Sequence, residues 1–340
     1  MTPNQLSLRP VAPEDWPRIS GLFSDLTYEQ SLTYAQAAAD RIGASAEFVA
    51  LYDAQDIPIA AACLRIKKIP VLNRGIAWIA AGPLTCVAGQ PEPSAEMLGA
   101  ILSKLRDHAR AAGHILRLRF PVQVNPAEDA VAQAGFASTD KAATYRTVLI
   151  NPDQDEEDLM RALHGKWRNP LRNALKADLG LETGSILDLS DRFTHLYEQV
   201  RDAKGFQPDI PPEFYYALSG PDFDHDVLIA RKDGEDIGAM TIGCSGSTAT
   251  YLFGATSDAG RRLNAGHYLM WQAMLYCRER GIKCFDLGGI DPEANPSVTR
   301  FKLRTGGADA IAAGPYEARP AGPGAALVNF AETLHKKLKS

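Results

Sequence analysis

The sequence lacks the features that mark metal-dependent, secreted and membrane-spanning proteins. Its five cysteines are scattered without a CxxC pair, and no two of its seven histidines stand at metal-ligand spacing. This pattern argues against a zinc site or a disulfide framework and favours reduced thiols. No apolar run approaches the ~18 residues that cross a bilayer, and residues 1–16 contain no apolar signal-peptide core. We therefore expect a cytoplasmic protein with no metal and no membrane span.

The sequence also lacks an excess of positive charge, because its 36 lysines and arginines are outnumbered by 41 acidic residues and the formal net charge is −5. Such a chain has no general attraction to nucleic acid, so DNA is not an expected partner. One local exception is a basic cluster made of Arg161, Lys166, Arg168, Arg172 and Lys176. These side chains could contact phosphates, or they could form an ordinary solvated helix face. Pro170 is expected to break or kink this segment.

The length of 340 residues suggests two domains, and the sequence contains a duplicated unit. Each half has two apolar strands around a short polar turn, then a third strand, a helix ending in Arg-x-x-Gly and a further strand. Glycine after a basic last turn is a helix C-cap signal. The corresponding segments are 47–62, 75–82, 96–112 and 114–120 in the first half, and 227–241, 249–255, 265–280 and 282–287 in the second.

This order of elements predicts an α+β (mixed α/β) protein with helices packed on largely antiparallel sheets. The halves are expected to meet near Asn151-Pro152, giving domains 1–150 and 151–340. The acidic run 153–158 should begin a helix, because carboxylates complement the positive N-terminal end of the helix dipole. The basic helical segment 156–180 then opens the second domain.

Four stretches of the sequence carry recognisable motifs: Gln30-Ser-Leu-Thr-Tyr34, Lys166–Lys176, Tyr251-Leu-Phe-Gly-Ala255, and Asp286-Leu-Gly-Gly289 with Val298–Lys302 and Gly306-Gly307. Read in order, they resemble the Fem-type aminoacyltransferases (FemA, FemB, FemX) and related bacterial tandem-GNAT N-acyltransferases. The resemblance extends over roughly residues 30–320. It implies two tandem GNAT-like domains that attach an amino acid or acyl group to an amine. Members that build peptidoglycan bridges take the amino acid from aminoacyl-tRNA.

The resemblance gives Lys302 a catalytic role. We expect this lysine on a strand, where its ammonium could stabilise a developing oxyanion. Asp286 ends a strand just before Gly288 and Gly289, which permit close backbone approach to a ligand. Its carboxylate could orient the amine or take its proton. The alternatives are a solvated lysine on an exposed strand and a turn-capping aspartate.

Three aromatic residues are candidate acceptor contacts: Tyr251, Tyr215 and Phe301. Tyr251 is expected to point into the same cleft as Lys302, with a core position as the alternative. Tyr215 resembles a family position that contacts the acceptor. Where an arginine precedes that position in binders of cell-wall precursors, this sequence has 209–211, Asp-Ile-Pro. The difference argues against a UDP-muramyl-peptide acceptor.

The donor-binding loop differs from that of acetyl-CoA enzymes, which hold pyrophosphate on a Gln/Arg-x-x-Gly-x-Gly/Ala turn at a helix N-terminus. Arg261 and Gly266 fit this pattern, but Asn264 replaces the first glycine. Asparagine tolerates a positive φ, although its side chain would occupy space that pyrophosphate needs. Segment 87–94 of the first half has no phosphate loop, so its donor site is expected to be degenerate.

The favoured function is transfer of an aminoacyl group, from aminoacyl-tRNA held by Lys166, Arg168 and Arg172, to an amine of a small-molecule or peptide acceptor. An acyl-CoA-dependent N-acyltransferase of the GNAT superfamily is the first alternative. A non-catalytic ligand-binding protein of the same fold is the second. No cofactor is expected to be bound permanently, since either donor would be a co-substrate.

Overall fold

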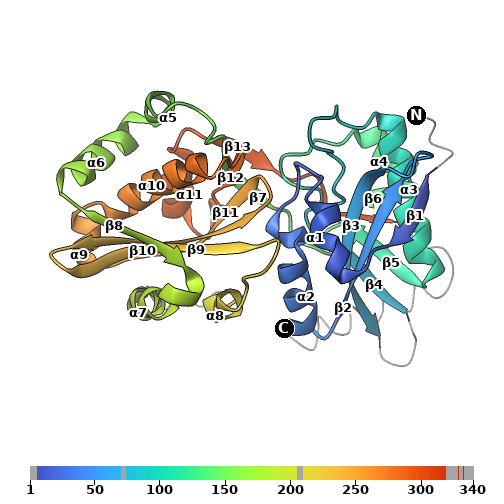
Figure 1. The fold of residues 1–340 in the computed structure, drawn as a ribbon, viewed down its shortest axis with the longest axis horizontal. Helices are drawn as coiled ribbons and strands as arrows, with labels where there is room; N and C mark the ends of the chain where they lie inside the picture. The colour runs from blue at the N-terminus through green and yellow to red at the C-terminus, as the bar shows by residue number, and fades with distance from the viewer. Residues whose placement is uncertain (1–5, 70–73, 205–209, 319–327, 329–331, 333–340) are drawn as a thin grey trace. The chain divides into compact units, whose positions relative to one another are not determined.

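The computed structural model describes residues 6–69, 74–204, 210–318, 328 and 332. The chain forms two compact units (Figure 1). Unit 1 contains residues 1–145 and 311–340, and unit 2 contains residues 146–310. Each unit is built on one seven-stranded sheet.

The sheet of unit 1 has the strand order β1-β2-β3-β4-β5-β14-β6. Neighbouring strands pair antiparallel, apart from β4 and β5, which are parallel. A parallel pair requires a crossover, and a helix between β4 and β5 supplies it. The strands are β1 (Ser7–Pro10), β2 (Ser45–Tyr52), β3 (Pro58–Ile69), β4 (Arg74–Ile79), β5 (His114–Leu118), β6 (Phe136–Ser138) and β14 (Tyr316–Ala318).

Helices cover both faces of this sheet. Helices α3 (Ala95–Ala111) and α4 (Glu128–Gln133) pack on one face, and α1 (Trp16–Ser20) and α2 (Leu32–Arg41) lie against the other. The 3-10 turns η2 (Pro13–Asp15) and η3 (Tyr28–Gln30) precede α1 and α2. Buried Gln30 joins β3 to the turn after β4, because its amide oxygen accepts from Cys63 N (2.8 Å) and its amide nitrogen donates to Ala80 O (2.6 Å). The Gln-Ser stretch therefore supports the fold.

Unit 2 repeats this plan with the strand order β13-β7-β12-β11-β10-β9-β8. The adjacent strands β11 and β12 are its parallel pair, and β7 pairs antiparallel with β12. The strands are β7 (Arg146–Ile150), β8 (Gly180–Ser185), β9 (Asp224–Lys232), β10 (Glu235–Ser245), β11 (Thr248–Thr256), β12 (Cys284–Asp286) and β13 (Ala308–Ile311).

The helices of unit 2 also form two layers (Figure 1). One face of the sheet carries α6, α10 and α11 over the larger apolar core, and the other carries α7. Trp167, Leu171 and Ala174 form the buried stripe of α6. The helices are α5 (Glu156–Ala162), α6 (Gly165–Lys176), α7 (Ile186–Lys204), α8 (Pro212–Tyr216), α9 (Asp258–Arg262), α10 (Ala265–Glu279) and α11 (Pro296–Leu303).

The units exchange one strand each, which corrects the boundaries expected from the sequence. Strand β7 follows unit 1 in the chain but joins the sheet of unit 2, whereas β14 follows unit 2 but pairs between β5 and β6. The break therefore falls after Tyr145, before the expected Asn151-Pro152, and residues 311–340 belong to unit 1. Strand pairing between distant segments depends on tertiary packing, which local sequence patterns do not record.

The duplicated elements are confirmed, with two local corrections. The crossover helices α3 and α10 end before Gly113 and Gly281, and both glycines have the left-handed φ of a C-cap. However, α6 runs through Pro170 without the expected break, because its buried stripe continues on both sides of the proline. The strand expected at Lys302 is a helix, α11, which Pro296 opens at its first position.

Candidate functional site

The parallel strands of unit 2 separate after a short pairing. Strands β11 and β12 pair only from Thr248 to Thr250, opposite Cys284 to Asp286, and β11 then continues to Thr256. In unit 1, β4 pairs with β5 over five residues. Backbone bonds from Arg119 N to Ile79 O and from Gly82 N to Arg119 O extend that contact further. Unit 2 therefore leaves a length of β11 beyond the reach of its parallel neighbour.

The loop after β12 lies in this opening and is held by Asp286. The carboxylate accepts hydrogen bonds from Gly288 N (2.8 Å) and the Thr147 hydroxyl. Gly288 has a φ of +74°, and a Cβ at this position would lie 2.6 Å from Tyr251 O. Only glycine allows both this conformation and this close approach. Asp286 therefore caps the turn, as the simpler interpretation of the sequence expected.

Helix α11 positions Lys302 under the loop. The helix begins where the Asn295 side chain accepts from Val298 N, with Pro296 at the first position. Thr299 and Lys302 are its buried residues and stand three apart, on one face. Lys302 is 5% exposed, so the alternative of a solvated surface lysine is wrong.

The Lys302 ammonium is held by neutral acceptors. Its Nζ donates to Gly288 O and Gly289 O, both at 3.1 Å, and lies 5.1 Å from the centre of the Tyr251 ring. Across the described chain, no carboxylate lies within ion-pair distance of this nitrogen. Burial lowers the pKa of Lys302 to about 8, although the charge of Asp286 acts to raise it. The lysine is therefore a cation at neutral pH that loses its proton readily.

Tyr251 supplies the wall opposite the lysine. Burial raises its pKa to about 12, so the phenol is neutral at physiological pH. A Cβ on Gly254 would lie 2.3 Å from the Tyr251 hydroxyl, so a larger residue at that position would have to displace the phenol. The ring faces Lys302. The structure thus brings together Lys302, Asp286 and Tyr251, as expected from the sequence.

Thr147 belongs to the same cluster and was missed in the sequence. It lies on β7, far from the matched stretches, and is fully buried. Its hydroxyl contacts both Asp286 Oδ1 and Gly288 O, the latter at 2.9 Å. A threonine in the strand Arg-Thr-Val-Leu-Ile looks like any β-branched strand residue. Only the exchange of β7 into this sheet brings it to the site.

The other two aromatic candidates are packed within unit 2. Phe301 lies between Trp167 (ring centres 5.6 Å apart) and His267 (5.0 Å). Tyr215 is buried with its ring 5.2 Å from that of Phe253, and its carbonyl oxygen lies 3.0 Å from Nδ1 of His225. Phe301 thus joins α11 to α6, which fixes the helix that carries Lys302. An acceptor contact by either residue stays a prediction.

The expected donor loop joins α9 to α10. Asn264 has the left-handed conformation (φ 57°, ψ 34°) predicted for it and makes no side-chain capping bond. Arg261 is turned back, since its guanidinium donates to Thr256 O (3.0 Å) and pairs with Asp258. A Cβ on Gly266 would meet Thr256 Oγ1 at 3.6 Å, an ordinary contact. By contrast, Ser94 caps the corresponding helix α3 by accepting from Met97 N.

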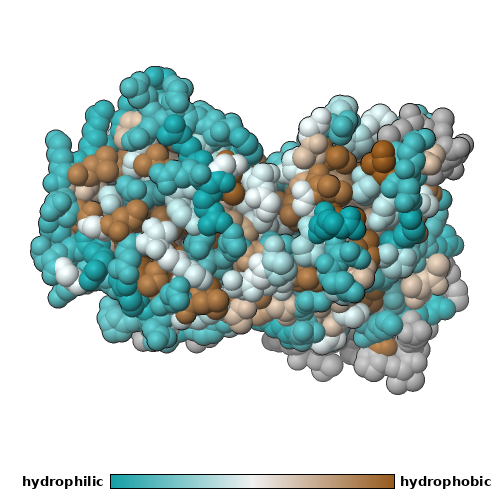
Figure 2. Space-filling model, in the orientation of Figure 1, coloured by the Kyte–Doolittle hydropathy of each residue, from teal (hydrophilic) through white to brown (hydrophobic). Residues whose placement is uncertain are grey.

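The basic residues of α6 form an outward face. Lys166, Arg172 and Lys176 are exposed, whereas Arg168 is partly buried and donates to Leu163 O (2.9 Å). No carboxylate in the described part of the chain lies within ion-pair distance of any of the four. Figure 2 shows a largely hydrophilic surface at the end of unit 2 that carries α5 and α6. The helix sequence itself contains no acidic residue.

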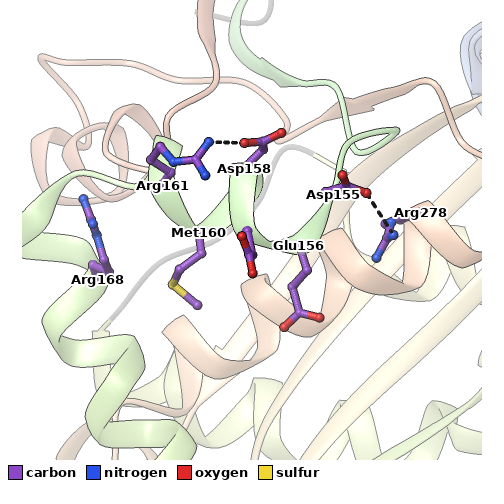
Figure 3. A pocket seen from close by; sticks show the side chains of 8 residues that line it. Asp155, Glu156, Asp158, Met160, Arg161, Arg168 and Arg278 are labelled. Atoms are coloured by element: carbon purple, nitrogen blue, oxygen red, sulfur yellow. Dashed lines mark hydrogen bonds and ion pairs between the residues drawn. The ribbon is translucent and has the colours of Figure 1, made fainter.

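A hollow of about 940 Å³ lies beside α5 and α10 (Figure 3). Its lining is mostly charged and includes two ion pairs, Arg161 with Asp158 and Arg278 with Asp155. None of its lining residues belongs to the Lys302 cluster. The lining consists of Asp155, Glu156, Glu157, Asp158, Met160, Arg161, Arg168 and Arg278. In the described residues no helix is long and apolar enough to cross a bilayer, and no group of three or more His, Cys, Asp or Glu side chains is placed to hold a metal.

Known proteins show the same architecture. Residues 165–302, from the start of α6 to Lys302, match the model of the acetyltransferase (GNAT) domain. The crystal structure of FemX superposes with a TM-score of 0.79, covering 96% of this chain and 100% of that one, at 16% identity. The C-terminal domain of a putative lysylphosphatidylglycerol synthetase from Agrobacterium fabrum reaches 0.55, covering 95% and 96%, at 14% identity.

Two curated proteins share sequence with the chain, and both are named lipid II:glycine glycyltransferase. The one from Staphylococcus haemolyticus is 28% identical over 106 residues, which is 31% of this chain and 25% of that protein. The one from Staphylococcus saprophyticus is 25% identical over 159 residues, which is 46% of this chain and 36% of that protein. The resemblance to Fem-type proteins is confirmed. This resemblance rests on the two GNAT-like units of the fold. The sequence match covers only a quarter to about a third of the length of these glycyltransferases.

Proposed function

We propose that this Fem-like protein is an N-acyltransferase that moves an aminoacyl group to the amine of a small-molecule or peptide acceptor. The buried cation at Lys302 carries the proposal. It lies between the Gly288–Gly289 carbonyls and the Tyr251 ring, where β11 separates from β12. Its position and charge suit the oxyanion that forms when an amine attacks an acyl carbonyl. The named relatives transfer glycine, which supports an aminoacyl rather than an acetyl group.

In the proposed reaction, the acceptor nitrogen attacks the donor carbonyl and the Lys302 ammonium donates to the oxygen that becomes negative. The bond between the carbonyl carbon and the donor oxygen breaks. The acceptor nitrogen loses a proton, and the donor oxygen leaves with a proton. In the free protein, the ammonium donates to Gly288 O and Gly289 O, and its nitrogen lies 5.1 Å from the centre of the Tyr251 ring. Donation to the oxyanion therefore replaces one of these contacts, and Gly289 is the exposed one of the two glycines.

We infer that aminoacyl-tRNA is the donor and docks on the basic face of α6. Charge of one sign along a helix destabilises it, since like charges four residues apart repel. Arg168, Arg172 and Lys176 follow each other at this spacing, ~6 Å of helix rise apart. Such a row suits the phosphates of a nucleic-acid backbone.

Helix α11 extends this positive surface toward the site. Phe301 packs on Trp167 and so joins α11 to α6. Arg300 and Arg304 stand two residues on either side of Lys302, which places them on the opposite side of the helix from the buried lysine. No carboxylate in the described chain lies within ion-pair distance of either arginine. A bound RNA would thus lie against the helix that holds Lys302. A cytoplasmic location, where charged tRNA is found, is part of this proposal.

Filter binding of aminoacyl-tRNA across a salt series tests the donor. Replacing Arg172 and Lys176 by glutamate should weaken binding at least tenfold and reduce the slope of log K against log salt by about two, because two phosphate contacts are lost. Exposed Lys104 and Arg110 on α3 provide the matched control, and their replacement by glutamate should leave binding unchanged. Equal binding by both double variants would remove the α6 face from the proposal.

An acyl-CoA donor is the second candidate, favoured by the GNAT match and by the uncapped, left-handed start of α10. A bound acyl-CoA would raise the melting temperature of the protein. Gly266→Ala should abolish that rise without lowering the free protein's stability, because the added Cβ meets only an ordinary contact. Thermal protection by acyl-CoA without tRNA binding would replace the first candidate. If neither donor binds and Lys302→Ala leaves the biological phenotype intact, the protein is a non-catalytic ligand-binding member.

A further inference from the structure

The buried hydroxyl of Thr147 lies at the centre of the polar cluster beneath the site. It contacts two acceptors, Asp286 Oδ1 and Gly288 O. The first belongs to the residue that caps the Gly288 loop, and the second is one of the two carbonyls that hold the Lys302 ammonium. Thr147 therefore links the carboxylate to the lysine through a shared carbonyl oxygen.

A hydroxyl has one hydrogen, so it cannot donate to both acceptors at once. When Asp286 is ionised, the hydrogen goes to the carboxylate, because a charge-assisted bond is the stronger. Gly288 O is then left to the lysine. When Asp286 is protonated, its own hydrogen goes to Thr147, and Thr147 donates to Gly288 O, which accepts from Lys302 with its other lone pair. The direction of one buried hydroxyl thus connects the charge of Asp286 to the acceptor that orients Lys302.

Packing alone does not require a hydroxyl here. Thr147 is fully buried on β7, and the next residue, Val148, is buried and apolar. Valine would fill the same β-branched position, and a buried hydroxyl without partners would cost free energy. Thr241 on β10 shows the contrast, since it is equally buried but its hydroxyl has no recorded partner in the described structure.

We infer that Thr147 is the positioning residue that fixes Asp286 and the Gly288 carbonyl and, through them, the orientation of the Lys302 ammonium. The inference concerns the same site as the proposed function, and its kinetic consequence rests on that function. Its structural consequence, a change in the titration of Lys302, does not depend on the proposed function. The titratable groups facing the ammonium are Asp286 on β12 and Tyr251 on β11.

The test is a titration of Lys302 in protein labelled with ¹⁵N at the lysine side chains, with the signal assigned by its absence in Lys302→Met. Thr147→Val should lower the pKa of Lys302 by about half a unit or more, because the Asp286 charge that raises it is no longer held in place. Thr147→Ser keeps the hydroxyl and should restore the original titration. Thr241→Val, the matched buried control, should not move it.

Kinetics form the second measurement. Thr147→Val should lower kcat about tenfold with KM within twofold, Thr147→Ser should recover most of the rate, and Thr241→Val should match the original protein. An unchanged Lys302 titration in a folded Thr147→Val protein would overturn the inference. If the titration shifts as expected but the unmodified protein transfers no aminoacyl group, the proposed function fails while the positioning role of Thr147 stands.

Discussion

Both units place a cation over a tyrosine ring, but the cations are neutralised differently. In unit 1, Arg119 directly follows β5, with its guanidinium 4.7 Å from the Tyr145 ring. In unit 2, Lys302 lies 5.1 Å from the Tyr251 ring. Arg119 forms an ion pair with Glu29. Within the described residues, the Lys302 ammonium donates to two backbone carbonyls and lies over the ring, and it forms no ion pair. The duplicated fold thus has a satisfied charge in one copy and an available charge in the other.

The pKa shifts follow this difference. Burial acts to lower the pKa of Arg119, but the charge of Glu29, the neighbouring Tyr145 and Tyr28 and the hydrogen bond to Glu29 together outweigh it, and the pKa lies above its ordinary value. Burial also acts on Lys302, where the charge of Asp286 offsets it only in part, and its pKa falls to about 8. A buried cation without an anionic partner costs stability. Such a cost is typical of functional sites, so unit 2 is where we expect the chemistry.

The largest expected effect is on catalysis. Lys302→Met should lower kcat by about 10²- to 10³-fold, because one preorganised oxyanion donor is removed. The unfolding free energy at neutral pH should stay the same or rise, since the variant no longer buries a charge. Single-turnover aminoacyl transfer and urea unfolding measure the two quantities. Full activity in Lys302→Met would remove the lysine from the mechanism.

The matching change in unit 1 should affect stability instead. Arg119→Met leaves Glu29 without its partner and should reduce the unfolding free energy by about 3 kcal/mol, the lower end for a broken buried pair. We expect a loss at the lower end of this range because the Glu29 side chain remains 19% exposed. The Arg119→Met protein that remains folded should keep the kcat of the unmodified protein, when the rate is divided by the concentration of folded molecules. A stable Arg119→Met protein with a hundredfold lower kcat would place chemistry in unit 1 as well.

A smaller effect is expected from the glycine that shapes the loop. Gly288→Ala should destabilise the protein by about 2 kcal/mol, because alanine resists the positive φ and its Cβ would press on Tyr251 O. Gly266→Ala is the control and should keep the stability or raise it by up to about 1 kcal/mol, because alanine favours the helix. Thermal unfolding compares them. Equal stability of the two variants would show that the loop relaxes away from β11.

The pH dependence of stability gives a further comparison. The pKa of Lys302 is about 8 in the folded protein and near its ordinary 10.5 when unfolded. The unfolded chain therefore binds the proton more tightly, and the lysine's contribution to stability rises with pH between these values. From pH 7 to pH 9.5 this amounts to about 2 kcal/mol. The stability difference between Lys302→Met and the unmodified protein should shrink by that amount, and a constant difference would mean an ordinary lysine pKa.

Much of this architecture can be predicted from the sequence because its signals are local. The helix around Leu105 shows apolar periodicity, and Gly113 and Gly281 mark helix ends through their backbone freedom. Asn264 was expected to take a left-handed conformation for the same local reason. The cluster of Lys302, Asp286 and Tyr251 was found only because several short motifs resemble those of a known family.

What the sequence did not reveal depends on contacts between distant segments. The exchange of β7 and β14 sets the unit boundaries, and neither strand carries a mark of the sheet it joins. Thr147 reaches the site only through that exchange. Lys302 was expected on a strand because the apolar residues around it resemble one, whereas the Asn295 cap and Pro296 together start a helix. Recognising that cap would have corrected the prediction.

The pH–rate profile of aminoacyl transfer tests the role of Lys302 most directly. If the ammonium stabilises the oxyanion, the rate should fall as pH rises through about 8, where the lysine loses its proton. Lys302→Arg, which stays charged throughout, should lose that fall even if its rate is lower. Ionisation of the acceptor amine affects both proteins alike, so the comparison isolates the lysine. A rate that rises through pH 8 only when Lys302 is present would make the lysine a base and contradict the proposal.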